Sequence, residues 1–228
     1  MIWFRKKATG LRSPQPAVRA ELLCDRTLAA LADEYADEQD TPYVRFVAAR
    51  ASLLVGDRAV ARRHLHELLA LPTVTTQEQL LAWNCLRDLD ELPSPGAASV
   101  VRGVVVDQGT PAGLETLAAY ADRTAKWIHA DGTVLGVDAP GAGAHDAIDG
   151  LLTAARAVVA HTDPHRGAAE NPPEAAHTCL RVLTFAGTHV GLGPTATLER
   201  DPVGGAVLRA AAALQQTLLR AKERHADG

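Results

Sequence analysis

The chain has 228 residues, of which 47% are hydrophobic and 22% are charged, with a formal net charge of −4 at pH 7. This length and composition are ordinary for a globular protein with room for one large domain or two small ones. The slightly acidic balance argues against general nucleic-acid binding, because such an interface needs a basic face to neutralise phosphates. No run approaches the ~20 apolar residues that span a bilayer, so no integral membrane segment is expected.

The three cysteines (Cys24, Cys85 and Cys179) are far apart and form no Cys-x-x-Cys pair. Neither a disulfide framework nor a zinc ribbon is therefore indicated. The first residues, Met-Ile-Trp-Phe-Arg-Lys-Lys, lack the apolar stretch of a secretory signal. Together with the abundance of Ala and Arg, this favours a cytoplasmic bacterial protein.

Helical periodicity dominates the first part of the chain. Residues 1–15 are predicted to be a basic tail, and residues 16–92 an α-helical module of four helices. Thr41-Pro42 and Thr75 are predicted helix starts. The apolar stripes are Cys24, Leu28, Leu31 and Tyr35; Val44, Val47, Ala48, Ala51 and Leu54; Ala61, Leu65, Leu68 and Leu69; and Leu81, Cys85 and Leu89.

The second and third helices carry the pattern Ala48-x-x-Ala51-x-x-Leu54-x-Gly56-Asp57, followed by Ala61-x-x-x-Leu65-x-x-Leu68. This pattern resembles the helix–turn–helix unit of tetratricopeptide-type repeats. The resemblance implies an antiparallel α-hairpin closed by Gly56. A lone α-hairpin, as found in unrelated helical bundles, is the alternative.

A run of strand-forming segments follows a Pro-rich boundary at residues 92–96, where a second domain over 97–228 is predicted to begin. The predicted strands are 98–109, 114–120, 125–130 and 133–137. Asp122-Arg123 and Asp131-Gly132 separate the last three. An Asp-Gly pair between strand-forming residues predicts a hairpin with a type I′ turn, in which both central residues have φ > 0.

The remaining elements complete an α+β prediction. They are a helix near Asp146, a strand over 180–186, a Gly-rich return over 187–194 that could pair with it, and a long final helix starting at Pro202. The expected fold is a helical module followed by an antiparallel sheet (a meander plus a hairpin) packed with two helices. This element order resembles profilin and roadblock domains. The phrases at 113–122, 131–132 and 187–194 resemble a set of uncharacterised bacterial proteins, a likeness that implies no catalytic residue.

The Gly-rich segment contains the first candidate ligand site, consisting of Thr188, His189, Gly191 and Gly193. Glycines can bring the backbone close to a ligand, and a histidine can serve as a base or a hydrogen-bond donor. His129 is a second candidate polar group, in a pocket where this predicted turn meets the meander. The alternative is a purely structural turn, which needs only permissive backbone angles.

Three aromatic residues are candidate partner-binding groups. Trp127 shares a strand face with His129, where it either packs against a helix or anchors a partner. Trp3 and Phe4 precede a basic cluster and are predicted to contact a partner, the alternatives being a disordered tail or weak membrane contact.

The histidine-rich segments predict no metal site. His64 and His66 lie two positions apart on a helix and point in nearly opposite directions, so both cannot bind one ion. The cluster of His161, His165 and His177 lies in a Pro-rich segment, where solvated loop histidines are favoured over a zinc site. The pair Gly141 and Gly143 precedes a helix but lacks the Lys and Ser/Thr of a phosphate-binding loop. No cofactor is predicted.

The sequence as a whole favours a non-enzymatic protein–protein interaction or adaptor protein, because it contains no Gly-x-Ser-x-Gly, His-Glu-x-x-His or Cys-x-x-Cys motif. A homo-oligomer formed through a sheet edge or the final helix is also possible. The alternative function is a small-ligand sensor or enzyme with its pocket near residues 187–194.

Overall fold

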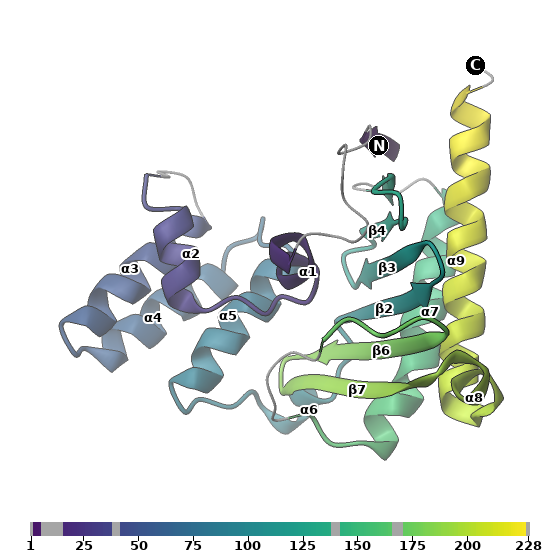
Figure 1. The fold of residues 1–228 in the computed structure, drawn as a ribbon. Helices are drawn as coiled ribbons and strands as arrows, with labels where there is room; N and C mark the ends of the chain where they lie inside the picture. Colours follow the sequence, from purple (N-terminus) through teal and green to yellow (C-terminus); the bar gives the residue numbers. More distant parts are fainter. Residues whose placement is uncertain (1, 6–15, 38–41, 138–141, 166–170, 227–228) are drawn as a thin grey trace.

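The computed structural model describes residues 2–5, 16–37, 42–137, 142–165 and 171–226. Within these ranges, an N-terminal helical region precedes an antiparallel sheet, and long helices pack on the sheet's far side (Figure 1). The predicted α+β class is confirmed.

Helices α1 to α5 form the helical region: α1 (Pro16–Leu22), α2 (Leu28–Glu34), α3 (Tyr43–Leu54), α4 (Arg58–Leu69) and α5 (Thr76–Asp88). The Asp57 carboxylate caps α4 by accepting a hydrogen bond from the Val60 amide at 3.0 Å. Thr75 forms a capping box with Glu78 at the start of α5. Gly56, with φ of +81°, closes the α3–α4 hairpin, while Thr41 lies outside the described residues.

The prediction of one helix running from Cys24 to Tyr35 is wrong. Cys24 lies in the connection between α1 and α2, in the left-handed region with φ of 51°. The Thr27 hydroxyl starts α2 by accepting a hydrogen bond from the Ala30 amide at 3.2 Å. Cys24 is nevertheless buried. In the sequence, an apolar residue that a turn places in the core cannot be distinguished from one on the buried face of a helix.

The strands are β1 (Ile2–Arg5), β2 (Gly103–Thr110), β3 (Gly113–Tyr120), β4 (Ala125–Ile128), β5 (Val134–Val137), β6 (His177–Thr184) and β7 (Gly187–Pro194). Across the described residues they form one sheet in the order β1-β5-β4-β3-β2-β6-β7, and each neighbouring pair is antiparallel. The predicted meander is β2 to β5, and the β6–β7 hairpin is added at the other side of β2.

The hairpin turns of the meander differ from the predicted type I′ form. In the β4–β5 connection Gly132 has φ of +82° but Asp131 is not in the positive region, and in the β3–β4 connection only Arg123 is, at +65°. The Arg123 amide donates to the Tyr120 carbonyl at 2.9 Å. One left-handed residue at the end of each turn is the pattern of a longer hairpin loop.

The predicted basic tail is not all tail. Residues Ile2–Arg5 form β1, which pairs with β5 in a register that runs from Ile2 opposite Val137 to Arg5 opposite Val134. Without β1, β5 would be an edge strand with unpaired backbone groups, so this pairing satisfies them. The side chains of Trp3 and Phe4 lie outside the described part of the structure, so their predicted partner contact stays a prediction.

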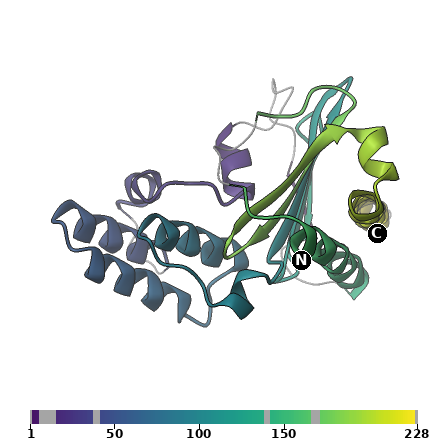
Figure 2. The same ribbon diagram turned by 90° about the horizontal axis from the view of Figure 1, so that it is seen from below.

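The sheet separates two hydrophobic cores, as Figure 2 shows with the sheet seen nearly edge-on. The face that carries Val105, Tyr120 and Leu183 packs against α1 to α5. The opposite face, which carries Val104 and Leu117, packs against α7 (Ala142–His161) and α9 (Pro202–Ala226). Successive side chains along each strand therefore point into opposite cores. One of these cores is shared between the sheet and the helical region.

Two short helices complete the fold: α6 (Pro95–Ala98) and α8 (Thr195–Arg200). α6 occupies the predicted Pro-rich boundary, with Pro95 as its first residue, the position where proline is tolerated. In the described parts of the chain, no helix has both the length and the apolar character needed to cross a membrane.

Candidate functional site

A cleft of about 990 Å³ opens between the helical region and the β6–β7 hairpin. Its walls come from the α1–α2 connection, α5, the segment after α7, and both strands of the hairpin. The lining residues are Leu23, Cys24, Asp25, Leu80, Asn84, Arg87, Leu92, Asp163, Pro164, His165, Arg181, Leu183, Thr184, Ala186, Gly187, Thr188 and Val190. Segments from both ends of the chain thus meet at one concave surface, the usual form of a small-molecule site.

Beside the cleft lies a buried ion cluster, formed by Asp107, Arg181, Arg19 and Thr116. The Asp107 carboxylate, which is fully buried, accepts hydrogen bonds from Arg181 Nη1 at 2.6 Å, from Arg19 Nε at 3.1 Å and from the Thr116 hydroxyl at 2.6 Å. A buried carboxylate is tolerated only when it is paired in this way. The cluster links α1 to β2 and β6, and Arg181 is its one member that lines the cleft.

Arg181 has hydrogen-bonding capacity that the described residues do not use. Its side chain is 3% exposed, and its Nη2 is buried without a hydrogen-bond partner in the described part of the chain. Leaving an N–H group unpaired in an interior costs about 1–3 kcal/mol. A buried guanidinium with an open donor, lining a cleft, is the feature expected of a group that binds a ligand.

Arg87 is a second guanidinium in the cleft, presented by α5. Its Nη1 donates to the Phe185 carbonyl at 2.6 Å, and its Nη2 donates to the Asn84 side-chain oxygen. In the described part of the chain Arg87 forms no ion pair, although the Asp88 carboxylate acts on it electrostatically. Burial is the larger effect and lowers the pKa of Arg87 below its usual value. The Phe185 ring stacks on Trp83 with centroids 5.6 Å apart, which holds the hairpin against α5.

The predicted pairing of the Gly-rich segment with the strand before it is confirmed, because the segment is itself a strand. It forms the whole of β7, paired with β6 along eight residues, and the hairpin turn lies before it at Phe185 and Ala186. Because no Cβ at Gly191 or Gly193 would meet an atom within 4 Å, these glycines leave open space beside the strand. Neither lines the cleft, whereas Thr188 does.

His189 lies on the other face of the sheet from the cleft. It pairs in register with Val182, which belongs to the core formed with α7 and α9. His189 is 3% exposed, its Nδ1 is 2.9 Å from the Thr162 hydroxyl, and burial lowers its pKa. Alternation along a strand explains the split between Thr188 and His189, because successive side chains point to opposite faces.

His129 and Trp127 are far from the cleft. Trp127 lies on β4 and His129 just beyond its end, and their ring centroids are 3.9 Å apart. Three strands (β3, β2 and β6) separate β4 from β7, so the structure does not bring His129 together with His189. Trp127 is 7% exposed and packs in the core with α7 and α9, which is the burial alternative and not an exposed partner surface.

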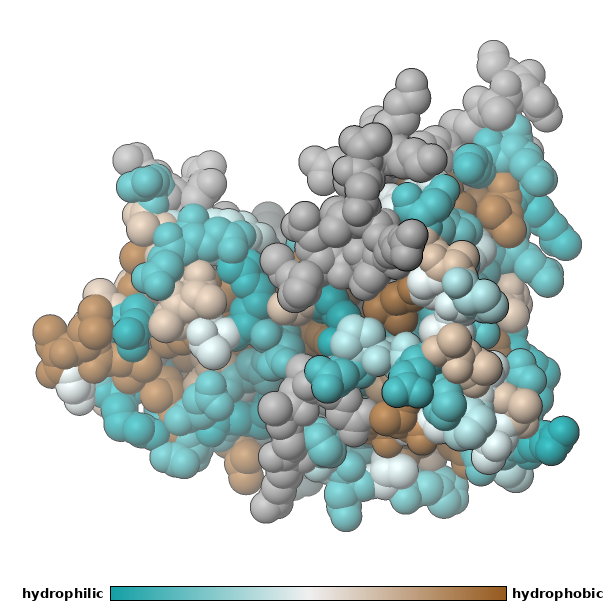
Figure 3. Space-filling view, in the orientation of Figure 1, coloured by the Kyte–Doolittle hydropathy of each residue, from teal (hydrophilic) through white to brown (hydrophobic). Residues whose placement is uncertain are grey.

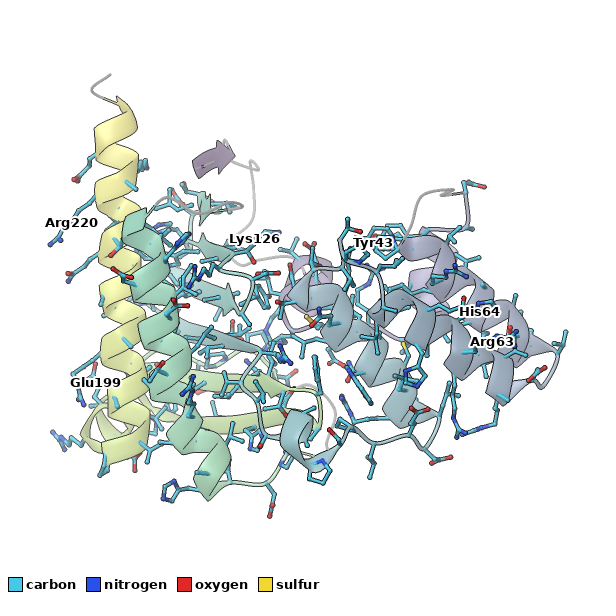
Figure 4. All side chains as sticks on the ribbon, turned by 180° about the vertical axis from the view of Figure 1, so that it is seen from behind. Tyr43, Arg63, His64, Lys126, Glu199 and Arg220 are labelled. Carbon is cyan, nitrogen blue, oxygen red and sulfur yellow. The ribbon has the colours of Figure 1, made fainter. Side chains whose placement is uncertain are left out.

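The other histidines engage separate neighbours. His64 Nδ1 lies 3.4 Å from Glu67, and His66 Nε2 lies 2.6 Å from Glu91; Figure 4 shows His64 beside Arg63 on α4. The backbone of His165 bridges to Thr188. Over the described ranges, no group of three or more His, Cys, Asp or Glu side chains could hold a metal ion.

A second surface lies at the end of the α3–α4 hairpin. Leu54 and Val55 are 71% and 82% exposed, and a hydrophobic patch covers this end of the helical region in Figure 3. In the sequence they lie between Leu53 and Gly56, both of which line a groove of about 460 Å³. We call the two side chains and this groove the hairpin tip; the groove is lined by Leu28, Leu53, Gly56, Arg58, Cys85, Asp88 and Leu89.

Three charged residues of this region were not predicted as site residues from the sequence: Asp107, Arg181 and Arg87. A signal for two of them was present, since Asp107 follows Val104-Val105-Val106 and Arg181 interrupts Leu180-Arg181-Val182-Leu183. A charged residue within an apolar strand must either face water or find a buried partner. Arg87 lies on an ordinary amphipathic helix and carries no such signal.

No protein-family model matches the chain, and no curated protein or solved structure is similar enough to it for relatedness to be inferred.

Proposed function

We propose that this protein is a non-enzymatic protein-interaction module that binds a partner through the hairpin tip. The supporting observation is the exposure of Leu54 and Val55 beside an apolar groove. Single exposed apolar residues are common, but adjacent ones next to a groove mark interaction sites more often.

The composition of the hairpin tip supports this proposal. Its apolar centre is bordered by an exposed ion pair, in which Arg58 Nη2 lies 2.7 Å from Asp90 Oδ2, and by Asp88. An apolar centre within a polar rim is typical of protein interfaces. Burying an exposed Leu or Val contributes about 1.5–3 kcal/mol each, so these two side chains can supply a large part of a micromolar affinity.

Site-specific photo-crosslinking in the native cells tests this function. A photoreactive amino acid at Val55 is expected to give one dominant crosslinked protein, identified by mass spectrometry. The same residue at Glu199, which is exposed on α8 (Figure 4), is the matched control. If the crosslinked protein is a second copy of this chain, the partner is the chain itself and the tip forms a homo-oligomer.

Binding of the purified partner then measures the contribution of the tip. The double variant Leu54→Ser/Val55→Ser is expected to bind about 100-fold more weakly, since each lost apolar side chain costs at least a factor of about ten. Stability should change by less than about 0.5 kcal/mol, because both side chains are largely exposed. Equal crosslinking at Val55 and Glu199, or unchanged affinity of the double variant, would refute the proposal.

A further inference from the structure

We propose that the cleft between the helical region and the β6–β7 hairpin binds a small organic acid, whose phosphate or carboxylate group is held by Arg181 and Arg87. This site is separate from the hairpin tip and adds a ligand to a protein proposed to bind a partner. The two proposals rest on different residues and can fail independently.

Arg181 supplies the strongest argument. The single negative charge of Asp107 is shared between Arg181 and Arg19, with Arg19 Nη2 at 3.0 Å and Arg181 Nη1 at 2.6 Å from the same carboxylate oxygen. Arg181 therefore shares its buried carboxylate with a second guanidinium. Because Arg181 is 3% exposed, water does not compensate it. An oxyanion in the cleft would supply an acceptor for Nη2 and a second negative charge near Arg181.

Arg87 adds a second positive charge that neutral acceptors hold in place. Its two bonds, to the Phe185 carbonyl and the Asn84 amide oxygen, orient the guanidinium through neutral acceptors. The Asp88 carboxylate acts on its charge electrostatically, but the described structure has no ion pair between them. Asn84 is itself fixed, since its Nδ2 donates to the Cys24 carbonyl at 2.6 Å. Guanidiniums are the side chains best suited to planar recognition of carboxylate and phosphate.

The rest of the lining restricts the ligand further. Leu80, Leu183 and Val190 give the cleft an apolar surface, which favours a ligand with an apolar body over a bare ion. Asp25 and Asp163 also line the cleft. Neither forms an ion pair with Arg181 or Arg87 in the described structure, and both disfavour additional negative charges on the ligand. The chemistry is therefore that of an acid with one oxyanion group and an apolar body.

Isothermal titration calorimetry at fixed ionic strength tests the site with four probes: inorganic phosphate, phenyl phosphate, phenylacetate and benzyl alcohol. We expect phenyl phosphate or phenylacetate to bind with a Kd below about 1 mM. The stronger of the two identifies the oxyanion as phosphate or carboxylate. Benzyl alcohol, which has the apolar body without the charge, should bind at least about tenfold more weakly, and phosphate alone should also be weaker.

Two charge-neutralising variants locate the binding. Arg87→Gln should weaken the preferred probe at least about tenfold. Arg87 is only half-buried, and replacing it leaves no buried carboxylate without an ion-pair partner. Arg220→Gln removes the same charge from the exposed face of α9, where the side chain points away from the protein (Figure 4), and should leave the affinity unchanged. Arg181→Gln should abolish binding where the variant folds.

Three results would overturn the proposal: no binding of either organic acid, equal binding of benzyl alcohol, or equal loss of affinity in the Arg87 and Arg220 variants. Because the hairpin tip contains none of these residues, such results would leave the proposed interaction function standing.

Discussion

The substitution Asp107→Asn is expected to destabilise the protein severely. Asp107 is fully buried and pairs with two guanidiniums, one of which, Arg181, is 3% exposed. An asparagine of the same shape removes the negative charge and leaves the Arg181 charge buried and uncompensated. Breaking a buried ion pair from one side costs about 3–5 kcal/mol, which is a large part of the 5–15 kcal/mol typical of a folded protein.

Urea denaturation measures this loss directly. With a slope of about 2 kcal/mol per molar urea, the midpoint should fall by about 1.5–2.5 M. The matched control is Asp149→Asn, which breaks the pair between Asp149 and Arg123 at 3.0 Å, where both side chains are about half exposed. An exposed pair contributes about 0–1 kcal/mol, so its midpoint should shift by less than about 0.5 M. Equal shifts in the two variants would refute the account of the buried ion cluster.

Three further outcomes follow from buried titratable groups. Burial lowers the pKa of His189, so below about pH 6.5 the unfolded chain takes up a proton that the folded protein excludes. The free energy of unfolding therefore decreases as the pH is lowered. His189→Gln should reduce the loss of unfolding free energy between neutral pH and about pH 5, and an unchanged loss would contradict this. The Tyr120 hydroxyl donates to the buried Leu22 carbonyl at 2.5 Å, so Tyr120→Phe should cost about 1–3 kcal/mol in chemical denaturation, and no cost would contradict the contact. Burial raises the pKa of Cys85 to about 12 and also raises that of Cys24, so a thiol reagent should label neither until the protein unfolds; rapid native labelling would show that they are accessible.

The local pattern of the chain was sufficient to predict the meander and most helices. Alternation in β2 and β3, and turn-forming residues such as Gly132, act over a few positions, so a single sequence reveals them. The Thr75 capping box is equally local. The β1–β5 pairing could not be predicted, because strand partners distant in sequence leave no mark in either segment alone.

The candidate site was predicted only in part, for a related reason. Thr188 lines the cleft, whereas His189, which the sequence placed in the same candidate site, faces the opposite core. Which face of β7 borders the cleft depends on which helices pack against each face of the sheet, and the sequence of β7 does not contain that information. The pairing of Asp107 with Arg181 likewise depends on the β2–β6 register, which the sequence does not contain.

The central claim is that the helical region and the β6–β7 hairpin together form one binding cleft. Hydrogen–deuterium exchange with and without phenyl phosphate tests this claim most directly. The account predicts slower exchange in peptides covering α5 and the β6–β7 hairpin, with no change in α9. Protection confined to other elements, or no protection at a probe concentration of several millimolar, would contradict it.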